Sequence, residues 1–145
     1  MPPPLTPLQS SLRFVRLIHG IFFLTMLLYP AFGERLQQGF IMSLSSPLFI
    51  AVAVVAAAAL AGAVLARLNT VQPALQSLPA NPNDLASLSR WKRGAILIRI
   101  LLEMIVLLGA GLRIMGASFS HVLPFYIIPI ALMLLWWPRQ IAPAA

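Results

Sequence analysis

Long apolar stretches, separated by short polar segments, run along most of this chain. Four of them are long enough for an α-helix to cross the ~30 Å hydrocarbon layer of a membrane. The predicted transmembrane helices cover residues 12–32, 47–68, 94–115 and 119–137. The pattern therefore predicts an all-α fold, an integral membrane bundle of four transmembrane helices formed by residues 12–139.

Polar and proline-containing segments predict the ends of these helices. Prolines crowd residues 1–11, where they disfavour a helix and predict a short disordered lead, and residues 140–145 form a short tail. Pro47 directly follows Ser46, a pattern that is typical of a helix N-terminus. Residues 69–89 contain several prolines and many Asn, Gln and Ser residues, so they predict a loop.

The first predicted helix also shares features with a secretory signal peptide. Arg13 and Arg16 precede its apolar stretch, and small residues follow at a spacing that suits cleavage. Tyr29 and Pro30, however, crowd that site, and the apolar stretch continues beyond the usual length of a signal. We therefore expect an uncleaved membrane anchor, with a cleaved signal as the alternative.

The second predicted helix, residues 47–68, consists largely of alanine and carries few large side chains. Small residues let two helix backbones approach closely in lipid. We therefore expect this helix to lie between neighbouring helices and to serve as a packing surface.

The composition excludes an ordinary soluble domain. Hydrophobic residues make up 60% of the chain and charged residues only 9%, whereas a soluble domain carries about a quarter charged residues. The net charge of +7 does not indicate nucleic-acid binding, because the basic residues are scattered at helix ends. The expected partners are the lipid bilayer and either further copies of the chain in a homo-oligomer or a larger membrane complex, with no nucleic acid.

The basic residues indicate the orientation of the bundle, because Lys and Arg accumulate on the cytoplasmic side of membrane proteins. Those on the side of the N-terminus are Arg13, Arg16, Arg67, Arg90, Lys92, Arg93 and Arg139. Arg35 and Arg113 fall on the opposite side. We therefore expect a multi-pass protein of the bacterial inner (plasma) membrane with both termini in the cytoplasm.

The third predicted helix carries Arg99, Glu103 and Arg113 inside or at the edge of its apolar span. At about 100° per residue, Glu103 lies about 40° from Arg99 and Arg113 about 40° on the other side, so all three share one face. An ionised side chain near the bilayer centre costs at least about 2.5 to 3.5 kcal/mol. This face is therefore expected to be covered within the bundle or at an oligomer interface.

Glu103 is the candidate for chemistry on this face, since it lies close to mid-membrane. In a functional interpretation its carboxylate binds a proton or a cation. In a structural one it forms a salt bridge with Arg99, one helical turn away. His19 lies at a similar depth to Arg99 and is expected to hydrogen-bond to the third helix, either structurally or as a proton relay to Glu103. Glu103, Arg99, His19 and Arg113 are therefore the candidate intramembrane polar site.

The sequence contains no pattern typical of an enzyme or a metal site. It has no Gly-rich phosphate loop and no serine in a nucleophile elbow. His19 and His121 lie too far apart along the membrane normal to share a metal ion. His121 is instead expected near Arg113 or Glu34, and we expect no catalytic residue, metal or cofactor.

Two resemblances bear on function. The first is carried by the residues Arg90-Trp91-Lys92-Arg93-Gly94, Glu103, Gly109, Leu112-Arg113, Gly116, Pro124-Phe125 and Pro138-Arg139. This stretch resembles small, uncharacterised bacterial inner-membrane proteins and implies no known activity. The second and third helices, with Glu103 in mid-membrane, are also similar to the proteolipid hairpin of rotary ATP synthases. That resemblance implies that Glu103 carries a translocated ion, although the chain lacks the family's glycine repeat and has a longer loop and two additional helices.

Two functions from different classes follow. The first is a structural or accessory component that packs with itself or a larger membrane partner, through the Ala-rich helix and the polar face of the third helix. The alternative is a small proton-coupled or cation transporter that uses Glu103, with Arg99 tuning its carboxylate.

Overall fold

The computed structural model describes residues 6–36, 46–81 and 84–138, and their regular structure is entirely helical, as predicted. The elements are α1 (Pro7–Arg35), α2 (Pro47–Ala66), the π-helix η1 (Arg67–Val71), α3 (Gln72–Ser77), α4 (Leu85–Ile114) and α5 (Phe119–Leu135). Three helices, Pro7–Arg35, the continuous helix Pro47–Ser77 and Leu85–Ile114, are long and apolar enough to cross a membrane. The apolar helix α5 is shorter, at 17 residues.

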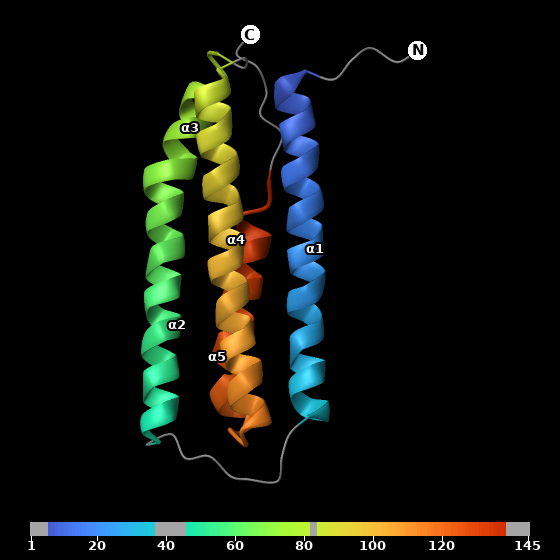
Figure 1. Cartoon of the computed structure of the whole chain (residues 1–145), viewed down its shortest axis with the longest axis vertical. Helices are drawn as coiled ribbons and strands as arrows, with labels where there is room; N and C mark the ends of the chain where they lie inside the picture. The colour runs from blue at the N-terminus through green and yellow to red at the C-terminus, as the bar shows by residue number, and fades with distance from the viewer. Residues whose placement is uncertain (1–5, 37–45, 82–83, 139–145) are drawn as a thin grey trace.

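Helix α4 is the centre of the bundle (Figure 1), with α1 and α2 on opposite sides of it and α5 against it. Helices α1 and α4 run in the same direction, and α2 and α5 run the opposite way. The core lies around α4, where Leu102 and Val106 are completely buried. Met26 of α1, Ala63 of α2 and Met133 of α5 are buried against it from the other helices.

Helix α1 begins at Pro7, so the predicted disordered lead is wrong for residues 7–11. The Thr6 hydroxyl accepts a hydrogen bond from the backbone N–H of Gln9, and the Gln9 side chain accepts one from the backbone of Thr6. This reciprocal capping box satisfies backbone donors at the helix start, where the missing N–H of Pro7 carries no penalty. The rest of the predicted lead, and the predicted tail 140–145, lie outside the described residues.

The predicted loop 69–89 is also wrong in its bounds, because helices extend into it from both sides. Helix α2 continues through η1 and α3 to Ser77. Helix α4 begins at Leu85. Asp84 caps it, because its side chain accepts a hydrogen bond of 3.0 Å from the backbone N–H of Ala86. Hydrogen bonding from Ser87 lowers the pKa of Asp84, which keeps this cap ionised at neutral pH.

The turn between α4 and α5 depends on Gly116. The backbone N–H of Gly116 bonds to the carbonyl of Arg113, and that of Ala117 bonds to the carbonyl of Leu112 at 2.9 Å. This Schellman motif satisfies the last carbonyls of α4 and requires a left-handed residue, which Gly116 supplies with a φ of 94°. The turn therefore reverses the chain between α4 and α5.

Substitution of Gly116 by alanine should destabilise the protein by about 1–2 kcal/mol, because a Cβ atom is disfavoured in the left-handed conformation. The measurement is thermal unfolding of the detergent-purified protein, followed by circular dichroism. Gly111→Ala is the matched control, since an added Cβ there would meet nothing within 4 Å. Equal unfolding temperatures for the two variants would contradict this account of the turn.

Candidate functional site

The polar face of α4 meets α1 along its whole length. Arg99 hydrogen-bonds to His19, Glu103 to Thr25 and Arg113 to Glu34, at sequence separations of 80, 78 and 79 residues. The separation stays almost constant because the two helices run in the same direction with the same rise per residue. We call these three contacts the α1–α4 polar ladder.

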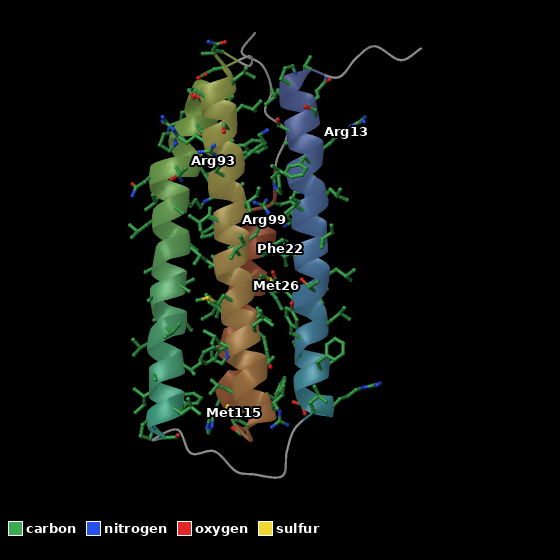
Figure 2. The ribbon with its side chains drawn as sticks, in the orientation of Figure 1. Arg13, Phe22, Met26, Arg93, Arg99 and Met115 are labelled. Carbon is green, nitrogen blue, oxygen red and sulfur yellow. The ribbon has the colours of Figure 1, made fainter. Side chains whose placement is uncertain are left out.

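Of the three α4 residues in the ladder, Arg99 lies nearest to the start of the helix. Figure 2 shows it below Arg93. Its side chain is only 4% exposed, and its Nε donates a hydrogen bond of 3.2 Å to Nδ1 of His19. Its Nη1 donates to the carbonyl of Ala95. The predicted hydrogen bond between His19 and this helix is therefore confirmed.

The salt bridge between Arg99 and Glu103, one of the two interpretations of this face, is not formed. Among the described residues the ion pair is Arg113 with Glu34, and none joins Arg99 to Glu103. Helical side chains lean toward the N-terminus of their helix, and Arg99 accordingly reaches back to Ala95. Glu103 instead finds hydrogen-bond donors on α1.

Glu103 accepts two hydrogen bonds from hydroxyl groups of α1. Its Oε1 lies 2.8 Å from the Thr25 hydroxyl and 3.0 Å from the Tyr29 hydroxyl. The Thr25 hydroxyl also lies 2.9 Å from the carbonyl oxygen of Phe22, so its single proton is shared between two acceptors. Thr25 and Tyr29 therefore hold the Glu103 carboxylate together from α1.

Arg113 holds Glu34 at the opposite end of the ladder. Its Nε and Nη2 donate to the two carboxylate oxygens at 2.6 and 2.7 Å, a bidentate geometry, and its Nη1 donates to the carbonyl of Ala117 at 2.9 Å. The ion pair thus links the ends of α1 and α4 to the turn before α5. Their positions in the sequence place both residues at this end but do not show that they pair.

The ring of His121 packs edge-on against Phe49 of α2, with ring centroids 6.3 Å apart. Among the described contacts, no hydrogen bond or ion pair joins His121 to Arg113 or Glu34, the residues near which the sequence predicts it. No group of three or more His, Cys, Asp or Glu side chains is placed to hold a metal ion, within the part of the chain that the structure describes.

A cavity of about 490 Å³ lies beside Arg99, where α5 ends between α1, α4 and the η1–α3 segment. Its lining combines apolar side chains with basic and aromatic ones, and the basic and aromatic residues are His19, Arg67, Arg99, Trp91, Trp136 and Trp137. The guanidinium of Arg67 lies 4.8 Å from the ring centroid of Trp136, a cation–π contact. The sequence places Arg67 near a membrane boundary but gives no sign that Arg67, Trp136 and Trp137 line one cavity with Arg99.

No protein-family model, curated protein or solved structure matched this chain.

Proposed function

We propose that the protein is a multi-pass component of the bacterial inner membrane, with both termini in the cytoplasm, and that its role is structural or accessory. The α1–α4 polar ladder is the observation that carries this proposal. Arg99, Glu103 and Arg113 each hydrogen-bond to α1. Polar side chains that hydrogen-bond across two helices in this way hold the helices together in register.

The apolar surface supports the membrane placement. Large side chains such as Leu24, Val54 and Leu107 are exposed along three different helices, as suits contact with lipid tails. The basic residues Arg13 and Arg93 lie toward the same end of the bundle (Figure 2), which supports a cytoplasmic location for that end.

The outer face of α2 is the surface that we propose for contact with a second copy or a membrane partner. The two faces expected to contact a partner are used inside the chain, since Ala56, Ala59 and Ala63 are buried and the polar face of α4 meets α1. On the outer face of α2, Ala58 and Ala61 are exposed. Small residues on an exposed face permit a second close helix contact in lipid.

The structural role predicts different effects for two substitutions of Glu103. Glu103→Gln keeps an acceptor oxygen for Thr25 and Tyr29 and should leave thermal stability close to that of the wild type. Glu103→Leu removes the acceptor and should cost about 0.6–1.7 kcal/mol, between the average and the largest value measured for hydrogen bonds between membrane helices. Thermal unfolding in detergent, with proton flux into liposomes recorded for the same proteins, tests this expectation.

The second candidate function is a proton-coupled or cation transporter that uses Glu103. The observation that favours it is that no described cation forms an ion pair with this carboxylate, so a proton can be gained or lost without breaking a salt bridge. For this function, Glu103→Gln would abolish a proton flux while its unfolding temperature stayed unchanged. That pair of results would overturn the structural proposal.

A further inference from the structure

Arg99 is a buried cation for which the chain supplies no side-chain carboxylate. The sequence has three acidic residues, and each of them contacts groups other than Arg99. Glu34 pairs with Arg113, Glu103 bonds to hydroxyls of α1, and Asp84 caps α4. The described partners of Arg99, His19 Nδ1 and the Ala95 carbonyl, are neutral acceptors that do not balance its charge.

The cavity beside Arg99 offers hydrogen-bond donors. Because Arg99 donates to Nδ1 of His19, the proton of the neutral ring lies on Nε2. That Nε2 is buried and makes no hydrogen bond of normal length within the described part of the chain, although the backbone of Met133 lies near it. Nη2 of Arg99 likewise makes no hydrogen bond to another described residue. Arg99, His19 and the second guanidinium, of Arg67, line one cavity that no described acidic side chain lines.

The position of the cavity suits an anion at a membrane surface. Trp136 and Trp137 line it, and such residues gather at the level of lipid head groups. The volume of about 490 Å³ lies within the range of small-molecule sites. Arg16 donates a hydrogen bond of 3.2 Å to the carbonyl of Pro138, which ties the chain after α5 to α1 beside the cavity.

We propose that this cavity is a binding site for a phosphate group, either that of an anionic lipid head group or a free phosphate anion. Arg99 supplies the buried charge, and Arg67 supplies a second guanidinium in the lining. A guanidinium is well suited to this ligand because its N–H donors match phosphate oxygens in a bidentate geometry. The inference goes beyond the proposed structural role: the lipid source depends on membrane placement, whereas binding of free phosphate does not.

The test measures binding to the full-length protein purified in a zwitterionic detergent. Dioleoyl phosphatidylglycerol, dioleoyl phosphatidylcholine and inorganic phosphate are titrated separately, with the shift in unfolding temperature and native mass spectrometry as the two readouts. The variants are Arg99→Gln and Arg67→Gln, with Arg93→Gln as a matched control. Arg93 is an exposed arginine of α4 that does not line the cavity, so Arg93→Gln removes the same charge outside it.

We expect the wild type and Arg93→Gln to bind phosphatidylglycerol more tightly than phosphatidylcholine. Arg99→Gln and Arg67→Gln should each weaken that binding by about tenfold or more, as expected for loss of a charge-assisted hydrogen bond. If inorganic phosphate also binds the wild type and is bound more weakly by the two cavity variants, the ligand is a free phosphate anion. If inorganic phosphate does not bind, the ligand is a lipid head group. If Arg99→Gln does not fold, the comparison of Arg67→Gln with Arg93→Gln decides. The proposal is overturned if the wild type binds neither phosphatidylglycerol nor inorganic phosphate. It is also overturned if the cavity variants and Arg93→Gln lose affinity to the same extent.

Discussion

Replacement of Gly109 by alanine is expected to destabilise the bundle by about 1–3 kcal/mol, the usual cost of overpacking a filled core. An added Cβ at Gly109 would lie 2.6 Å from the Cβ of Phe125 and 3.2 Å from Cε1 of Tyr126. The clash at Phe125 is with an atom attached directly to the backbone, so a change of side-chain rotamer cannot relieve it. Helices α4 and α5 would have to move apart, which loses the packing that joins membrane helices.

Gly111→Ala controls for the change of residue type on the same helix. Its Cβ would meet no atom within 4 Å, and alanine in a helix interior is favoured over glycine by about 0.5–1 kcal/mol. We therefore expect Gly109→Ala to unfold at a lower temperature than the wild type, and Gly111→Ala at the same temperature or a higher one. If Gly109→Ala and Gly111→Ala unfolded at the same temperature, the close approach of α5 to α4 would be refuted.

The second large effect is expected for Ala63→Leu on α2. Ala63 is completely buried against the bundle, so the larger side chain has to force α2 away from α4 at a cost of about 1–3 kcal/mol. Ala61 is exposed on the same helix, and Ala61→Leu adds the same atoms toward the surroundings. Thermal unfolding of both variants in the same detergent measures the difference.

Ala61→Leu and Ala63→Leu also test whether the outer face of α2 contacts a second copy of the chain. If the outer face of α2 contacts another copy, Ala61→Leu should shift the oligomer toward the monomer in size-exclusion chromatography while its unfolding temperature changes little. Ala63→Leu should instead lower the unfolding temperature. A larger loss of stability in Ala61→Leu than in Ala63→Leu would show that the two faces of α2 have been assigned the wrong way round.

The helices could be predicted because apolar stretches of this length leave few other structures for the chain. Their ends were missed where polar residues extend a helix beyond its apolar part. Thr6 and Gln9 carry the pattern of a capping box, and Asp84 is a common N-cap residue, so signals for both true starts were present in the sequence. The helical continuation through η1 carried no comparable signal.

The candidate site was predicted in its residues but not in its pairing. Helical periodicity correctly places Arg99, Glu103 and Arg113 on one face, because it depends on α4 alone. The partners depend on which helix covers that face, and nothing in the spacing indicated that Thr25 and Tyr29 of α1 would hold Glu103. The cavity was out of reach for the same reason, since three segments distant in the sequence enclose it with α4.

The central place of α4 also constrains how the protein is made. Helices α1 and α2 are synthesised first, yet they have no substantial contact with each other, and each packs against α4. His19 and Tyr29 of α1 therefore lack their hydrogen-bond partners on α4 until Arg99 and Glu103 have been synthesised. A nascent chain that stops before α4 exposes these groups in the membrane, which makes the third long helix the step that commits the chain to its fold.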